Sequence, residues 1–399
     1  MAGIYIHIPF CASRCIYCGF YSTTGLQLRQ QYVDALCQEV KARSAANTIS
    51  TIYLGGGTPS QLTPSQLRQI FDSLYKYNKV EPGAEVTIEV NPDDVSPEFA
   101  DVIRQLPINR VSMGAQTFDN SRLRFLHRRH SASQVSDAVS RLRDAGIKNL
   151  SIDLMYGFPT LNLSPGIGLQ EGVALSGQSL TDWEHDIDAV LTLAPEHISA
   201  YCLSIEPGTP LARLCQVNEN PAARRAMPSL SFPDEETERA MYEHLIDRIT
   251  AAGYEHYEIS NFARPGYRSR HNSAYWDGSP YIGLGAAAHS FDGQACRSWN
   301  VADIHQYIDG IKSGCPNRSE EHLSDDEQYN DRVATALRTR EGLPLGDLSP
   351  RHFAHCLAEA RPFIDSGLLQ ITHSPSHSLT LTRQGLFVSD MIISALMRV

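Results

Sequence analysis

The chain has 399 residues, 42% of them hydrophobic and 20% charged, which is an ordinary balance for a globular protein. Its formal net charge of −11 argues against the basic surface that nucleic-acid binding requires. The sequence has no apolar window of about twenty residues for a membrane span, and its N-terminus lacks the features of a secretory signal. We therefore expect a cytoplasmic protein that binds no nucleic acid and has no membrane span.

Strand-like and helix-like segments alternate through the first half of the chain. Apolar and β-branched runs predict strands at 3–8, 50–57, 85–90, 109–116, 149–157 and 197–205. Helical periods lie between these strands, including residues 28–43 and a segment that begins near Pro64. Six such units indicate an α/β fold with a parallel sheet, as a partial (β/α)6 barrel. A doubly wound open sheet is the alternative, because periodicity alone does not separate the two.

Two loops and a change of pattern complete the organisation. Residues 160–178 form a Gly- and Ser-rich insertion, and 206–233 form a Pro-rich loop that ends where Pro233 precedes a helix. After about residue 300, two helices, a short two-stranded piece and a final helix resemble a small α+β winged-helix module. We therefore expect a barrel domain over 1–299 and a C-terminal domain over 300–399. This second domain has no basic stripe, which favours a packing or lid role over DNA binding.

Unusual polar residues follow each predicted strand at its carboxyl end, where a βα barrel forms its active site. These are the first three cysteines, the "GGGTP" run at 55–59, Glu89, Asn91, Gln116, Asp153, Tyr156 and Tyr201. Burying an unpaired carboxylate is costly, so Glu89 and Asp153 must face a partner, a polar cavity or a polar sheet edge. The glycines allow close approach of a ligand to the backbone, although a tight turn would need them too.

Three of the nine cysteines are clustered, as Cys11, Cys15 and Cys18, in a C-x₃-C-x₂-C pattern. Three thiolates suit an iron–sulfur cluster with one iron open to another ligand, whereas a structural zinc site normally takes four protein ligands. His7 is the candidate fourth zinc ligand, but it alternates with Tyr5 on one strand face and points along the barrel wall. The other six cysteines are scattered singly, as expected of free thiols in a reducing compartment.

The cysteine pattern resembles the signature of radical S-adenosylmethionine (SAM) proteins. That resemblance implies a [4Fe-4S] cluster on the three cysteines, with the open iron binding the amino and carboxylate groups of SAM and "GGGTP" meeting the amino group. "YIHIPFC", "GGGTPS", "IEVNPDD", "RVSMGAQTFD", "LHRRHS" and "IDLMYGFP" are similar to the oxygen-independent coproporphyrinogen III oxidase family. By motif match, its SAM contacts fall on Tyr5, Tyr17, Gly56, Gly57, Thr58, Glu89, Gln116, Arg128 and Asp153. The C-terminal module resembles the corresponding domain of that family, called the HemN-type domain.

Two features separate subgroups of this family. Phe20 stands where the oxidase has a fourth cysteine, and the chain carries "HNSAYW" at 271–276 followed by "GLGAAAHS" at 283–290. These features are similar to those of the HemW heme chaperones, which implies reversible heme binding and delivery to an acceptor protein. His271 is then the candidate heme contact, with Tyr275 and Trp276 as flat apolar surface; a loop histidine beside core aromatics is the ordinary alternative. The sequence does not predict which protein accepts the heme, which could be membrane-bound, or which protein donates electrons.

Two other functions stay open at this stage. An oxidase would use the reduced cluster to cleave SAM, and the resulting 5′-deoxyadenosyl radical would abstract hydrogen from a porphyrinogen propionate and lead to decarboxylation. A structural protein would instead hold zinc on the three thiols. The heme chaperone is the preferred hypothesis, because Phe20 and the "HNSAYW" segment depart from the oxidase pattern.

Overall fold

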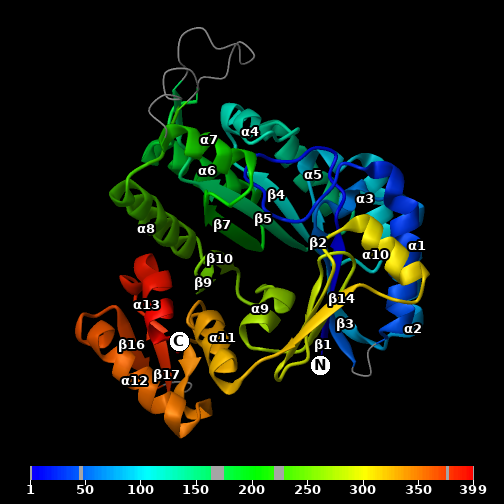
Figure 1. Cartoon of the computed structure of the whole chain (residues 1–399). Coiled ribbons are helices and arrows are strands. Elements are labelled where there is room, and N and C mark those ends of the chain that lie inside the picture. The colour runs from blue at the N-terminus through cyan, green and yellow to red at the C-terminus, as the bar shows by residue number, and fades with distance from the viewer. Residues whose placement is uncertain (1, 45–47, 163–174, 220–228, 374–376, 399) are drawn as a thin grey trace.

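Six parallel strands, each followed by at least one helix, make up the first part of the fold (Figure 1). The computed structural model describes residues 2–44, 48–162, 175–219, 229–373 and 377–398. The strands are β1 (Ala2–Ile8), β2 (Ile49–Gly56), β3 (Val80–Val90), β4 (Arg110–Gln116), β5 (Asn149–Tyr156) and β7 (His197–Cys202). The helices are α1 (Arg29–Ala42), α2 (Pro64–Tyr77), α3 (Pro97–Gln105), α4 (Asn120–Phe125), α5 (Ala132–Asp144), α6 (Leu180–Leu193), α7 (Pro210–Glu219) and α8 (Glu235–Ala251).

The order of the strands decides between the two expected architectures. The sheet runs β1-β2-β3-β4-β5-β7, and each neighbouring pair is parallel. A doubly wound sheet would reverse its order at a switch point, so the partial barrel is confirmed. The sheet stays open, because its two edges carry different additional strands. One edge adds β11 (Tyr281–Leu284), β12 (His289–Phe291), β13 (Cys296–Asn300) and β14 (Arg318–His322), and the other adds β10 (Asn261–Ala263) and β9 (Glu255–Glu258).

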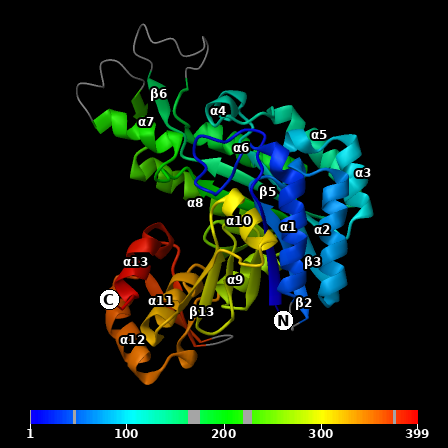
Figure 2. The same ribbon diagram turned by 45° about the vertical axis from the view of Figure 1, so that its right-hand side comes forward.

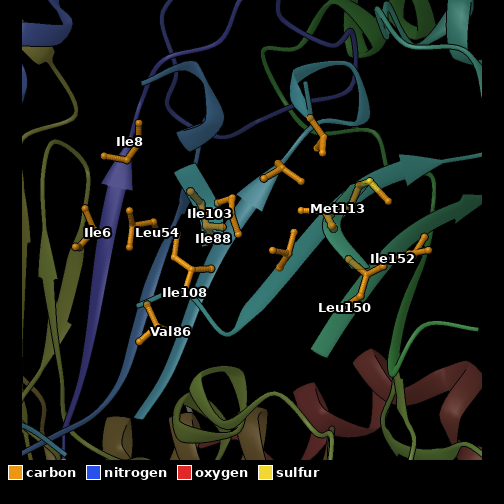
Figure 3. Packing of buried hydrophobic residues seen from close by; sticks show 14 of the residues in the cluster. Ile6, Ile8, Leu54, Val86, Ile88, Ile103, Ile108, Met113, Leu150 and Ile152 are labelled. Atoms are coloured by element: carbon orange, nitrogen blue, oxygen red, sulfur yellow. The ribbon is translucent and has the colours of Figure 1, made fainter. Parts of the chain in front are cut away.

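The two faces of the barrel strands differ in chemistry. Alternate side chains, such as Ile88 on β3, Met113 on β4 and Ile152 on β5, are buried in the main hydrophobic core (Figure 3). The residues between them on β4 and β5 include Ser112 and Asp153, which line a cavity. Because successive side chains on a strand point to opposite faces, one face packs against the helices and the other faces the interior of the barrel.

Capping residues set the starts of several helices. Thr63 and Gln66 form a capping box in front of α2, with Pro64 at the first helical position, so the predicted start near Pro64 is confirmed. The Asp234 side chain accepts the backbone N–H of Thr237 at the start of α8, just after Pro233. Each cap gives a partner to backbone N–H groups that the first turn of a helix leaves unpaired.

The prediction of a Pro-rich loop over 206–233 was wrong for part of that segment. It contains α7 and a short strand, β8 (Ser229–Ser231), which pairs with β6 (Thr160–Asn162). Leu211 and Leu230 are buried in a small hydrophobic cluster, and this tertiary packing outweighs the local proline and glycine signals. Residues 163–174 of the predicted 160–178 insertion, and residues 220–228, lie outside the described parts of the chain.

The C-terminal part has its own core. Helix α10 (Ile304–Lys312) still packs in the barrel core, whereas Tyr329 and later residues form a separate cluster. This unit lies beside α9 (Arg270–Trp276), away from α1 and α2 (Figures 1 and 2). Its elements are α11 (Asp325–Ala336), β15 (Leu343–Pro344), α12 (Pro350–Asp365), β16 (Leu369–Thr372), β17 (Ser378–Leu381) and α13 (Ser389–Leu396). We therefore propose a domain boundary just before α11, later than the residue 300 expected from sequence.

Across the described residues, no helix combines the length and the apolar character needed to cross a membrane.

Candidate functional site

A cavity of about 1000 Å³ lies in the barrel interior, walled by β2–β5, β7 and the loop between β1 and α1. Most of the residues predicted to bind the cluster and SAM line it. They are Cys11, Cys15, Cys18, Tyr17, Gly56, Gly57, Thr58, Glu89, Gln116, Arg128 and Asp153. Segments far apart in sequence thus meet around one space, as the pattern of polar residues at strand ends predicts.

The cysteine loop is held in place by backbone hydrogen bonds. The Cys11 N–H donates to Thr23 O at 2.9 Å, and the Thr23 N–H donates to Pro9 O at 2.7 Å. Two side-chain donors reach the sulfur atoms. Thr58 Oγ1 donates to Cys11 Sγ at 3.5 Å and Arg128 Nη1 donates to Cys15 Sγ at 3.6 Å. Such donors would stabilise metal-bound sulfur against the cost of its burial.

The three thiols fit an iron–sulfur cluster better than a mononuclear metal. Burial raises the pKa of Cys11 and of Cys18, and each thiol is close enough to Cys15 for its charge to raise the pKa further. In the described parts of the chain, no three His, Cys, Asp or Glu side chains are grouped as ligands of one metal ion. In a [4Fe-4S] cluster each cysteine binds a different iron, so its thiols need not converge on a single point.

His7 does not serve as a fourth ligand in this arrangement. Its Nδ1 lies 3.0 Å from Tyr5 Oη, and its Nε2 lies 2.9 Å from Tyr21 O. The ring is buried, and burial lowers its pKa. Both nitrogen atoms already have protein partners, which argues against the zinc alternative.

The glycine run at the end of β2 is required by the protein's own packing. Gly56 has φ +102°, and a Cβ there would lie 2.2 Å from the His7 ring. A Cβ on Gly57 would lie 2.6 Å from Ile8 O. The N–H groups of Gly57 and Thr58 donate to Ile8 O and Phe10 O at 2.9 and 2.8 Å. The glycines thus let β2 pass close to β1, and their N–H groups are already used.

Glu89 and Asp153 face the cavity with strongly perturbed pKa values. Burial raises the pKa of Glu89 to about 7, and the charge of Asp153 raises it further. Hydrogen bonds from Tyr53 and Gly56 lower it and oppose part of this shift. Tyr53 Oη donates to Glu89 Oε1 at 2.7 Å, and the Gly56 N–H donates to Oε2 at 3.0 Å. Burial also raises the pKa of Asp153 to about 6, although Ser199 and Arg110 oppose the shift. Two buried carboxylates with pKa values near neutrality favour a cationic or hydrogen-bond-donating ligand.

Gln116 ends β4, and Arg128, which follows α4, reaches the same strand with its side chain. Gln116 has φ +67°, and the β4–β5 register shifts between Gly114 and Gln116. Such irregular backbone costs free energy and occurs often at functional sites, where it redirects a side chain. The Arg128 guanidinium donates from Nη2 to Gly114 O, and its buried Nε has no hydrogen-bond partner among the described residues. An incompletely paired guanidinium on the cavity wall suits a carboxylate ligand.

Tyr5 and His271 line a second, smaller space of about 280 Å³ beside the main cavity. The two spaces share Phe20, Tyr53, Gly56, Glu89 and Asn272. Aromatic rings dominate this side chamber, which continues the main cavity towards α9.

The structure does not present His271 as a free heme ligand. Its side chain is 1% exposed, with Nδ1 2.8 Å from Thr51 Oγ1 and Nε2 2.9 Å from Tyr275 Oη. Burial lowers its pKa to about 3, so the ring is neutral. Its backbone N–H donates to Glu85 Oε1 at 2.9 Å. In this state both ring nitrogens have protein partners, and the residue anchors α9 to β2 and β3.

Sequence reasoning missed several polar residues of the barrel interior. These are Arg110, Ser112, Ser151, His197 and Ser199. Their signal was the alternation of polar and apolar residues in "RVSMGAQ", "SIDLMY" and "HISAY". A strand with such alternation has one polar face, whereas barrel strands filled by side chains are apolar on both faces.

The comparisons with known proteins agree with this geometry. Residues 5–171 match the model of the Radical SAM superfamily. The chain is 32% identical to the heme chaperone HemW of Bacillus subtilis, with 99% of both chains covered. It is 30% identical to HemW of Escherichia coli, with 77% of this chain and 76% of that one covered. The solved structure of the radical SAM enzyme coproporphyrinogen III oxidase (HemN) from Escherichia coli has the same fold, with a TM-score of 0.78 and 23% identity over 99% of this chain and 90% of that chain.

The chain is similar to several HemW proteins over its full length, it matches the radical SAM family model, and it shares its fold with HemN. The chain therefore belongs to the HemW family of radical SAM proteins.

Proposed function

We propose that the protein is a heme chaperone, which binds heme beside a [4Fe-4S] cluster and SAM and passes the heme to an acceptor protein. The observation that carries this proposal is the cavity, because it brings three thiols, two carboxylates and an arginine together and opens beside exposed aromatic surface. Membership of the HemW family supports the heme part of the proposal.

Cys11, Cys15 and Cys18 would hold the cluster, with Arg128 and Thr58 as donors to its thiolates. When bound, the cluster and SAM supply a ligand-binding iron and a source of one-electron chemistry. The carboxylates of Glu89 and Asp153 would accept hydrogen bonds from the ammonium and hydroxyl groups of SAM. An ammonium group only donates hydrogen bonds, so contacts from this segment to it would come from carbonyl oxygens. The N–H groups of Gly57 and Thr58 are used internally and are not available to other ligand groups.

Heme would bind at the mouth of the cavity, where large apolar side chains are exposed. Phe20 is 68% exposed and lines both the main cavity and the side chamber. Tyr201 lines the main cavity and is 43% exposed, and Ile205 is 46% exposed next to the cavity-lining Ser204 and Glu206. A flat porphyrin gains free energy by covering such surface. Phe20 thus replaces a thiol with an apolar ring next to the proposed cluster.

The test is anaerobic reconstitution followed by two assays on the same sample. Titration with heme should give a new Soret band, and a heme-free acceptor protein added later should take the heme up. Coproporphyrinogen III should release no CO₂ with SAM and a reductant present. A sample that releases CO₂ and binds no heme would be an oxidase, and this would contradict the proposal.

A further inference from the structure

A buried arginine at the inner end of the cavity has no role in the proposed cluster or SAM site. Arg110 begins β4, is 2% exposed and lines the cavity. Its Nη1 donates to Asn149 Oδ1 at 2.5 Å. Its buried Nε has no hydrogen-bond partner, and it forms no ion pair with any described residue. A buried guanidinium without a counter-ion is costly, so an anion is expected to approach it.

The surroundings of Arg110 are polar and contain one facing carboxylate. Asp153 is close enough for Arg110 to lower its pKa, yet the two form no ion pair. His197 is neutral, because burial and the charge of Arg110 both lower its pKa, and its ring nitrogens lie 2.8 Å from Ser151 Oγ and 2.7 Å from Tyr257 Oη. Nearby Arg338 pairs with Glu258 at 2.9 Å. Arg110 is therefore a buried positive group that faces the cavity without an ion pair among the described residues.

A second observation lies on the neighbouring strand. Thr87 on β3 is the register partner of Arg110 on β4. Thr87 is fully buried, and its hydroxyl also has no hydrogen-bond partner in the described structure. Ser112, two residues along β4, and Ser151 on β5 are register partners that add hydroxyls to the same cavity wall. Donors next to an unpaired guanidinium form the surroundings that a carboxylate prefers.

We propose that Arg110 is a binding residue for a ligand carboxylate, at a subsite distinct from the one beside Arg128 and the cysteines. If heme binds at the cavity mouth with its propionate edge directed inwards, one of its propionates is the carboxylate that this subsite takes. The identity of that ligand rests on the proposed function, whereas the need for an anion at Arg110 does not. The other carboxylate source is the methionyl group of SAM.

The test compares heme, heme dimethyl ester, coproporphyrin III and SAM on the reconstituted wild-type protein and on Arg110→Gln. Wild type should bind heme more tightly than the ester, whose propionates carry no charge. In Arg110→Gln the affinity for heme should fall about tenfold or more, and the difference between heme and ester should vanish. SAM affinity should fall less than heme affinity, because the variant touches SAM only through Asp153, whose pKa Arg110 lowers. Arg110→Lys, which keeps the charge but loses the planar fork, should lose less.

Arg122→Gln is the matched control. Arg122 is 5% exposed with an unpartnered Nε, but it pairs with Asp182 and does not line the cavity. This variant should bind all four ligands as wild type does. A loss for SAM alone in Arg110→Gln would assign the subsite to the SAM carboxylate. If wild type binds no heme, the proposed function fails. The role of Arg110 is then tested by comparing the affinities of wild type and Arg110→Gln for coproporphyrin III and SAM. Unchanged affinity for every carboxylate ligand in Arg110→Gln would overturn the inference.

Discussion

The cysteine loop and the "HNSAYW" segment both carry motifs of the family, but the structure treats them in opposite ways. The loop places three thiols on the wall of a large cavity, with Thr58 and Arg128 pointing donors at them. In the "HNSAYW" segment, His271 has protein partners on both ring nitrogens and is almost fully buried. The first region is thus built to receive a ligand, whereas the second is built to hold α9 against the barrel.

The largest expected effect is on the cysteine loop. Cys15→Ser should lose the iron–sulfur cluster, because three thiolates are the minimum that holds it with one open iron. Iron and sulfide analysis with absorption spectra of anaerobically reconstituted samples would measure the loss. Cys37→Ser is the control, since Cys37 is half-buried and donates to Gln69 O at 3.6 Å outside the cavity. Full cluster content in Cys15→Ser would contradict the role of the cysteine loop as the ligand-binding region.

A second prediction concerns His271. His271→Ala should lower the free energy of unfolding by about 2–4 kcal/mol, because it removes a buried ring and leaves Thr51 and Tyr275 without a partner. Urea unfolding would measure this loss. Heme bound to His271→Ala should still show a Soret band at the wild-type position, because His271 is not expected to be a heme ligand. His289→Ala, on an exposed position of β12, should cost less than about 0.5 kcal/mol. A shifted Soret band with unchanged stability would instead identify His271 as a ligand.

A third prediction concerns the pH dependence of the cavity. Burial raises the pKa of Glu89 from 4.5 to about 7 in the folded protein, so the folded state holds this proton more tightly than the unfolded state. The resulting stability is fully present below pH 4.5 and is lost as the pH rises through 7. At about 1.4 kcal/mol per pKa unit, raising the pKa from 4.5 to about 7 changes the free energy of unfolding by at most about 3.5 kcal/mol. Urea unfolding of cluster-free protein from pH 4.5 to 8 would show it.

Glu89→Gln should flatten that pH profile without abolishing its slope, because Asp153 titrates in the same direction. The same variant should weaken SAM binding about tenfold at pH 8, where the wild-type carboxylate is ionised, and less at pH 6. A pH profile identical to that of wild type would contradict the assigned pKa of Glu89.

The smallest expected effect is on the mouth of the cavity. Phe20→Ala should weaken heme binding by a few-fold, because an exposed ring contributes only the apolar area that the porphyrin covers. Tyr75→Ala is the matched control, since Tyr75 is 44% exposed on α2 and lines neither cavity. If Phe20→Ala and Tyr75→Ala bind heme with equal affinity, the heme site does not include Phe20.

The sequence predicted the six barrel strands because each is a run of apolar, β-branched residues next to helical periods. It also predicted the cysteines and carboxylates of the cavity, since residues at carboxyl ends of parallel strands meet. It did not predict that His271 is internally satisfied, because Thr51, Glu85 and Tyr275 reach it only in the folded sheet. Arg110 was missed since its unpaired state depends on side chains from other strands.

The edge strands β9 to β14 were also missed, and for a local reason. They are three to five residues long, and β14 reads "RSEEH" with every residue exposed. Such segments carry no apolar alternation. They become strands only because the open edges of the barrel offer unpaired backbone groups.

The most direct test of the central claim is electron paramagnetic resonance of the reduced, anaerobically reconstituted protein, with and without SAM. We expect the signal of a [4Fe-4S] cluster that changes when SAM is added, because the three cysteines line the cavity and would leave one iron open to SAM. A signal that SAM leaves unaltered, or the absence of any such cluster in a sample reconstituted under exclusion of oxygen, would contradict it.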